Sequence, residues 1–147
     1  MLIATLRILM FAVLTAIKWP PVHDTNKIVD ALAWAIANDP KPPAFESREF
    51  DATIAILTAV HESGLRMRAI GDGGKSLCFM QLQLAPESVL SDAYECAMRG
   101  LAAIHRSVEA CPESPLAPYM GGCGRVPKMA ARRLAEAKTI FEQVSSL

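Results

Sequence analysis

Glu62 is the side chain in this sequence with the strongest local case for acid–base chemistry. It ends an apolar stretch, residues 52–60, that carries no charged side chain. A carboxylate at the carboxyl end of a buried helix meets partial burial and the negative end of the helix dipole, and both disfavour its charged form. A neutral carboxylic acid there can donate a proton to a poor leaving group such as a glycosidic oxygen. The alternative is a glutamate turned outward into water.

Two other motifs near Glu62 fail on their spacing. The letters GGKS (residues 73–76) could end a nucleotide-binding phosphate loop. That motif requires another glycine five positions before Gly74, and this chain has Ala69 there. The preceding histidine and Glu62 begin a zinc motif only when a second histidine stands at position 65, which is leucine. Lys75 and Ser76 are therefore interpreted as turn residues, and we expect neither a metal nor another cofactor.

A central helix is predicted over residues 47–63, with Glu62 at its end. Ser47 supplies a capping side chain, the first turn is polar, and Gly64 offers a left-handed stop. Because this helix is apolar on nearly all sides, it belongs in the middle of a core.

Three further helices are expected around the central one: residues 26–39, 86–111 and 126–144. The first repeats apolar side chains at helical spacing and can be capped by Asp24 or Thr25. The second is expected to break near Asp92, and a short helical turn is expected at residues 116–119.

Residues 65–83 have no helical pattern. Glycines at 71, 73 and 74 supply left-handed positions, and Asp72 can fold back on its own backbone. We therefore expect an irregular loop or a small β-hairpin here, within a mainly α-helical fold.

The composition indicates one domain without a polyanionic partner. The chain has 147 residues, 52% of them hydrophobic, and 15 basic side chains balance 15 acidic ones. This length suits a single domain over residues 19–147, and the charge balance disfavours binding to nucleic acid. A monomer is expected.

Residues 1–18 leave two interpretations open. One arginine precedes an apolar run, Ile8–Ile17, which suits a signal peptide or a membrane anchor and is short for a full membrane span. No clean pair of small residues marks a cleavage site, so the alternative is a first helix of the domain itself.

The cysteines bear on the cellular compartment. All four lie in the second half of the chain: Cys78, Cys96, Cys111 and Cys123. Their spacings are not those of a zinc site. Two disulfides would indicate a secreted or periplasmic protein, and four free thiols a cytosolic one. The sequence does not choose among the three possible pairings.

Three short elements follow one another along the chain: a Glu-Ser pair at the end of an apolar helix, a Met-Gln pair after the glycine-rich loop, and a Tyr-x-x-Gly element before the last helix. Their residues are Glu62 and Ser63, Met80 and Gln81, and Tyr119 and Gly122. This order, over residues 54–141, resembles the lytic transglycosylase family, whose domain has a goose-type lysozyme-like fold. The resemblance implies that Glu62 is catalytic, that Ser63 orients it or its loop, and that the other residues line a substrate cleft.

The chain departs from the family pattern at two places. Cys78 stands where the family usually has glycine before its Met-Gln pair, which suggests a turn that is tied by a disulfide or tolerates a side chain. Met120 and Gly121 replace the family's Asn-Ala, which removes an amide able to contact sugar. The retained Tyr119 has a hydroxyl that could bond to the Glu62 carboxyl group, and Gln81 could bond to an N-acetyl group or stabilise its own loop.

The function implied by the resemblance is cleavage of the β-1,4 bond between MurNAc and GlcNAc in peptidoglycan glycan strands, by a periplasmic, secreted or phage-associated enzyme. The family needs one glutamate and leaves a 1,6-anhydro ring. One alternative is a hydrolytic lysozyme or phage endolysin in which Asp72 holds a water, as an inverting hydrolase does when its carboxyl groups lie about 6.5–9.5 Å apart. Another is a non-catalytic wall-binding or structural module on the same fold.

Overall fold

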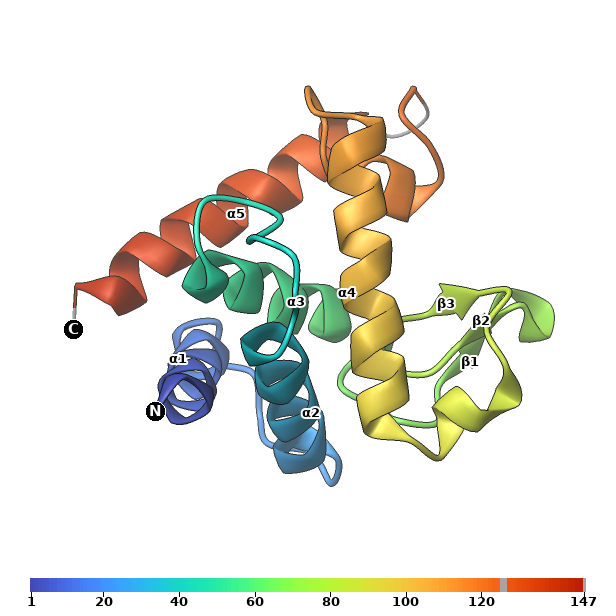
Figure 1. Cartoon of the computed structure of the whole chain (residues 1–147), viewed down its shortest axis with the longest axis horizontal. Coiled ribbons are helices and arrows are strands. Elements are labelled where there is room, and N and C mark those ends of the chain that lie inside the picture. The colour runs from blue at the N-terminus through green and yellow to red at the C-terminus, as the bar shows by residue number, and fades with distance from the viewer. Residues whose placement is uncertain (125–126, 147) are drawn as a thin grey trace.

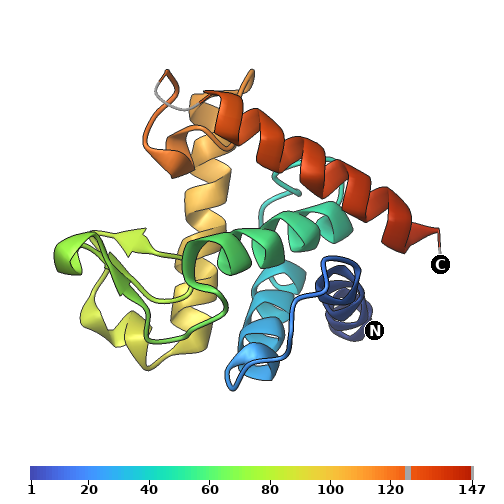
Figure 2. The ribbon, with the colours of Figure 1, turned by 180° about the vertical axis from the view of Figure 1, so that it is seen from behind.

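The computed structural model describes residues 1–124 and 127–146 and is mainly α-helical, as predicted (Figure 1). Its α-helices in these residues are α1 (Leu2–Ala16), α2 (Thr25–Ala37), α3 (Arg48–Ser63), α4 (Ala93–Ala110) and α5 (Pro127–Ser145). Short 3-10 turns lie at Asp72–Gly74, Glu87–Leu90 and Pro118–Met120. The two termini lie on the side away from the small sheet (Figures 1 and 2).

Helix α3 forms the centre of the fold and packs against α1, α2 and α5. Every residue from 50 to 60 is buried, which confirms the prediction from its unbroken apolar sequence. The Ser47 hydroxyl accepts a hydrogen bond from the Phe50 amide at 3.0 Å, and Gly64 ends the helix with φ 63°. Both predicted end signals therefore fix where Glu62 stands.

Helix α1 contributes to the same core. Its side chains Leu6, Met10, Val13 and Leu14 are buried, and the helix packs against α2, α3 and α5. Residues 2–16 thus form a helix whose apolar face is covered by the rest of the chain. Among the residues that the structure describes, no helix is both long and apolar enough to cross a membrane.

The start of α2 differs from the expectation in its capping. Asp24 occupies the capping position but makes no cap bond with its side chain. Its carboxylate instead accepts from the Met67 amide at 2.9 Å, and this bond, with that from His23, lowers the pKa of Asp24. The Thr25 hydroxyl accepts from the Val22 amide at 3.0 Å. Asp24 therefore ties the loop after α3 to the start of α2, because its carboxylate bonds to the distant Met67 amide and not to an amide of its own helix.

Helix α4 begins where the sequence predicted a break. The Asp92 carboxylate accepts hydrogen bonds from the amides of Tyr94 and Glu95 at 3.0 and 3.1 Å, as a capping residue does. The preceding turn, Glu87–Leu90, is a separate 3-10 element. The expected segment 86–111 is thus divided at Asp92.

The segment after α3 forms a small antiparallel sheet, slightly more than the hairpin expected. Its strands are β1 (Ile70–Gly71), β2 (Ser76–Leu77) and β3 (Leu82–Gln83), in the order β1-β2-β3. Gly71 pairs with Ser76, and Ser76 pairs with Gln83. Gly73, Gly74 and Lys75 of the GGKS letters lie in the β1–β2 turn, where the two glycines have φ values of 63° and 93°. Ser76, predicted as a turn residue, is instead the first residue of β2, because its backbone pairs with both neighbouring strands.

Two disulfides are present, Cys78–Cys96 and Cys111–Cys123. The first ties the turn between β2 and β3 to α4, and the second closes the loop between α4 and α5. Stable disulfides are typical of oxidising compartments, so this finding agrees with the secreted interpretation of the cysteines and not with four free thiols.

Candidate functional site

A cleft of about 660 Å³ lies between the small sheet, α4 and the turn Pro118–Met120. Its lining draws on four separate segments of the chain and includes Glu62, Asp72, Ser76, Gln81, Arg106, Ser107 and Tyr119. In Figure 2 the sheet and the loop after α4 lie on either side of the end of α3. The structure therefore gathers predicted residues from all three sequence elements, Glu62, Gln81 and Tyr119, around one cavity.

Glu62 lies in the last turn of α3, held by the local structure around that helix end. The Ser63 hydroxyl donates to the Ala59 carbonyl at 3.0 Å and accepts from the Arg66 amide at 3.2 Å. Ser63 is itself buried and is not among the residues that line the cleft. It thus anchors the loop that follows Glu62 and does not bond to the carboxylate.

Arg133 of α5 pairs with Glu62, and the sequence reasoning did not anticipate this contact. Its Nη1 donates to Glu62 Oε1 at 2.8 Å, and the two side chains are only 23% and 24% exposed. A shielded carboxylate needs a partner charge, and Arg133 supplies it. One signal existed in the sequence, because Arg133 lies three residues after Ala130 and four before Ala137, on the stripe that α5 buries.

Tyr119 lines the cleft but does not bond to Glu62. Its hydroxyl donates to the backbone carbonyl of Met80. Burial raises the pKa of Tyr119 well above its usual value, and the nearby charge of Glu62 raises that pKa further against the opposing effect of Arg133. The hydroxyl therefore remains a donor, and its role is to join the turn after α4 to the loop after β2.

Met80 lies beneath the cleft, which corrects the expectation that its side chain lines it. It is 0% exposed and packs against Gly100 of α4, where an added Cβ would stand 2.7 Å from Met80 Cγ. The tertiary structure buried this side chain because the glycine leaves room for it on the helix surface. Met80 contributes to the site through its backbone carbonyl, which accepts from the hydroxyl of the lining residue Tyr119.

Gln81 both lines the cleft and braces its own loop. Its side-chain amide donates to the backbone carbonyls of Ala69 and Cys78 at 3.2 and 2.9 Å. The side-chain carbonyl oxygen of Gln81 lies so close to Gly71 that a Cβ added at Gly71 would stand 2.2 Å from it. Of the two predicted roles, loop stabilisation is the one with contacts, and contact with a ligand stays a prediction.

Asp72 faces the same cleft as Glu62. Its carboxylate accepts a hydrogen bond from the Ser76 hydroxyl at 2.5 Å, and its backbone is left-handed with φ 50°. The aspartate thus supports the β1–β2 turn and also presents a second carboxylate to the cavity. Gly122, by contrast, is not among the lining residues, while its neighbour Gly121 is.

Ser107 is a residue of the site that sequence reasoning missed. Its hydroxyl donates to the Pro115 carbonyl at 2.5 Å and accepts from the Tyr119 amide at 3.1 Å. It therefore fixes the turn that carries Tyr119 to α4. Arg106, its exposed neighbour, adds a positive charge to the lining. Neither residue has a sequence signal beyond being polar near the end of a helix.

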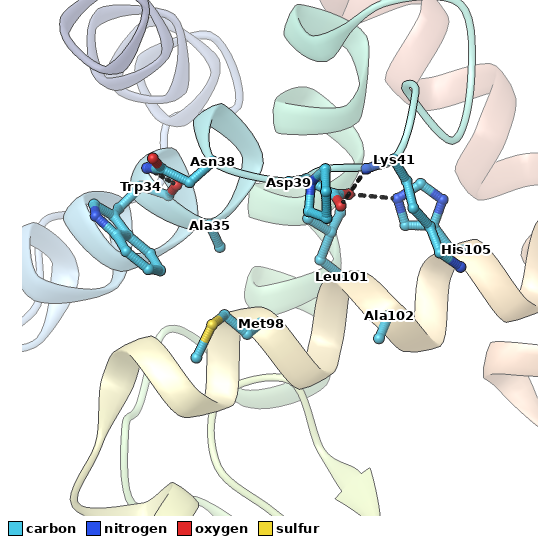
Figure 3. A pocket seen from close by; sticks show the side chains of 10 residues that line it. Trp34, Ala35, Asn38, Asp39, Lys41, Met98, Leu101, Ala102 and His105 are labelled. Carbon is cyan, nitrogen blue, oxygen red and sulfur yellow. Dashed lines mark hydrogen bonds and ion pairs between the residues drawn. The ribbon is translucent and has the colours of Figure 1, made fainter.

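A second, smaller cavity of about 250 Å³ lies between α2 and α4 and contains no predicted residue. Figure 3 shows Trp34 and Met98 at one end and the pair of Asp39 and His105 at the other. His105 Nε2 lies 2.7 Å from Asp39 Oδ2, and Asp39 Oδ1 accepts from the Lys41 amide at 3.0 Å. These bonds fix the loop after α2, which gives the pair a structural role.

Cys111, Glu113 and Cys123 come close enough for their side-chain atoms to surround an ion. The two sulfur atoms, however, form a disulfide, and a metal binds the thiolate rather than the disulfide. We interpret this cluster as a covalent closure of the loop with a carboxylate beside it.

Comparison of the chain with models of protein families, with curated proteins and with solved structures finds no match.

Proposed function

We propose that this protein cleaves peptidoglycan at the β-1,4 bond between MurNAc and GlcNAc, as a lytic transglycosylase with a lysozyme-like fold. The observation that supports this most is the meeting of Glu62, Gln81 and Tyr119 around one cleft. These residues come from three sequence elements that match the family pattern in order. A cleft of about 660 Å³ with both polar and apolar lining also suits sugar rings.

The proposed reaction needs one carboxyl group. The Glu62 carboxylic acid protonates the glycosidic oxygen, and the bond between that oxygen and the anomeric carbon breaks. The resulting carboxylate takes the proton of the MurNAc C6 hydroxyl, whose oxygen bonds to the anomeric carbon and closes a 1,6-anhydro ring. No water is consumed, and the proton that Glu62 gives to the glycosidic oxygen is replaced by the proton of the C6 hydroxyl.

The backbone at Cys78 supports the family assignment despite the changed residue. Cys78 has φ 64°, in the left-handed region that glycine adopts without a steric penalty. The position therefore keeps the conformation that the family's usual glycine would provide, and the Cys78–Cys96 disulfide holds it there. With a second disulfide in the chain, this favours action in the periplasm or outside the cell, including as part of a phage.

Hydrolysis is the second candidate, because Asp72 lines the same cleft. A carboxylate facing the acid can activate a water in an inverting hydrolase. The hydroxyl of Ser76 already occupies one oxygen of Asp72, so the aspartate would have to hold the water through the other. The transglycosylase mechanism needs no such second group and is the one proposed.

The test compares purified wild type with Glu62→Gln on isolated peptidoglycan, with Glu142→Gln as a matched control. Glu142 is an exposed residue of α5 that does not line the cleft. We expect wild type and the control to clear the suspension and Glu62→Gln to lose at least about a hundredfold in rate, as removal of an acid catalyst does. Mass spectrometry of the products should detect 1,6-anhydro muropeptides.

Two results would decide otherwise. Reducing-end sugars in place of anhydro products, lost in Asp72→Asn, would establish the hydrolase. Equal behaviour of wild type and Glu62→Gln would leave a non-catalytic wall-binding or structural module, which a pelleting assay with peptidoglycan can separate from a protein that does not bind glycan strands.

A further inference from the structure

The Glu62 carboxylate has one hydrogen-bond donor among the described residues, and that donor is Arg133. The bond joins Arg133 Nη1 to Oε1 only, and no described side chain or amide donates to Oε2. Because Glu62 lines the cleft, Oε2 is the oxygen left to meet a ligand. The contact is therefore one-sided, with one oxygen held by the protein and one available for chemistry.

We propose that Arg133 is the positioning residue of Glu62: by binding Oε1 it fixes the side-chain orientation in which Oε2 exchanges a proton with the substrate. The inference rests on the proposed function. It gives Arg133 the task that the sequence pattern suggested for Tyr119, whose hydroxyl is committed to the Met80 carbonyl.

Of the other charged or titratable groups around the cleft, Arg106 of α4 makes no hydrogen bond to Glu62, and three more already have different partners. His61, on the same helix, lies 3.1 Å from Glu136 of α5. Asp72, across the cleft, accepts from Ser76, and the hydroxyl of Tyr119 remains neutral and bonded. None of them replaces the bond from Arg133, so loss of that residue leaves the Glu62 side chain free to turn.

The docking of α5 does not depend on this ion pair. Ala130, Ala137, Ile140 and Val144 of α5 are buried, and the rings of Phe50 and Phe141 are 5.3 Å apart. The pair of His61 and Glu136 adds a second polar contact between α3 and α5. Replacing Arg133 should therefore affect the orientation of Glu62 more than the packing of the helices.

The experiment compares Arg133→Met and Arg133→Lys with wild type, and uses Arg132→Met as the matched control. Methionine keeps an apolar stem of similar length and removes the charge, and Arg132 is the exposed neighbour on the same helix. We expect Arg133→Met to lower kcat on peptidoglycan by about tenfold to a hundredfold, the effect of a misplaced catalytic group, with KM within about twofold of wild type. Arg133→Lys should recover part of kcat, and Arg132→Met should match wild type.

Thermal unfolding supplies the second readout. Arg133→Met should unfold within a few degrees of wild type, because the Glu62 carboxylate borders the open cleft, is 24% exposed and can be hydrated there. A kcat equal to that of wild type in Arg133→Met, or a fall in kcat matched by a large fall in unfolding temperature and not rescued by lysine, would overturn the positioning role. The comparison of Arg133 variants applies only if wild type is active and Glu62→Gln is inactive. If wild type does not act on peptidoglycan, the proposed function is refuted, and the role of Arg133 that rests on it is refuted as well.

Discussion

Replacing Gly100 with alanine should destabilise the protein, although alanine is the better helix former. Gly100 lies in the middle of α4, with the Met80 side chain directly against it. A Cβ added there would stand 2.7 Å from Met80 Cγ, 2.9 Å from Cε and 3.1 Å from Cβ. Met80 is 0% exposed and belongs to the hydrophobic core. The methionine must therefore move, and its carbonyl, which accepts from Tyr119, moves with it.

Two effects of opposite sign set the magnitude. Alanine is about 1 kcal/mol more favourable than glycine inside a helix, whereas forcing extra volume into a packed core costs about 1–3 kcal/mol. Because Cγ as well as the flexible methyl end is displaced, we take the upper part of that range, about 2–3 kcal/mol. The net loss is then about 1–2 kcal/mol, or about 3–6 °C in unfolding temperature for a chain of this size.

Thermal unfolding followed by circular dichroism measures this directly, and a second background isolates the cause. In Met80→Ala, which is itself expected to lose about 2–5 kcal/mol, the cavity gives room for the new methyl group. Gly100→Ala should then become neutral or stabilising. An increase in unfolding temperature for Gly100→Ala alone, or the same loss in both backgrounds, would refute the claim that Met80 and Gly100 are packed in direct contact. Gly124→Ala serves as the control, since a Cβ there meets nothing within 4 Å.

Three further outcomes are expected. Asp24→Asn should be less stable than wild type above about pH 3.8, because the charged carboxylate gains from its bond to the Met67 amide. The difference in stability should vanish as the pH falls through the lowered folded-state pKa of Asp24. Denaturant titrations at several pH values measure this difference. Deletion of residues 1–18 should abolish cooperative unfolding, because the four side chains that α1 buries contribute about 6–12 kcal/mol in total, as much as a typical domain's stability; a folded fragment in calorimetry would contradict it. Cys78→Ser with Cys96→Ser should cost about 3 kcal/mol for a loop of 18 residues. Reductant should destabilise wild type by about this amount more than it destabilises the double variant, which keeps only the Cys111–Cys123 bridge.

Some features of the site followed from local sequence because local interactions determine them. Ser47 and Gly64 mark the two ends of α3 through capping and left-handed geometry, both of which involve only neighbouring residues. The unbroken apolar run between them required burial on all sides. Together these signals placed Glu62 at the end of a core helix before any tertiary contact was known.

The loop after α3 was predictable in type and not in detail. Its glycines indicated turns, and the structure has left-handed residues there, but non-glycine positions such as Cys78 and Gln81 share that conformation. A disulfide to α4 and side-chain bonds to the backbone hold these residues in place. Local propensity disfavours such conformations, so the sequence by itself could not assign them.

What the sequence determined by itself was most of the elements: the helices after residue 24, their main end signals, the turn at Gly73 and Gly74, and a carboxylate at the end of the most buried helix. What only the tertiary structure decided was the partner of each polar group. Arg133 donates to Glu62, and Tyr119 donates to the carbonyl of the buried Met80. Asp24 accepts from the distant Met67 amide and does not cap its own helix. Helix ends and turns depend on a few adjacent residues, whereas a buried polar group takes the donor or acceptor that packing brings to it, and residues far apart in the chain supply that partner.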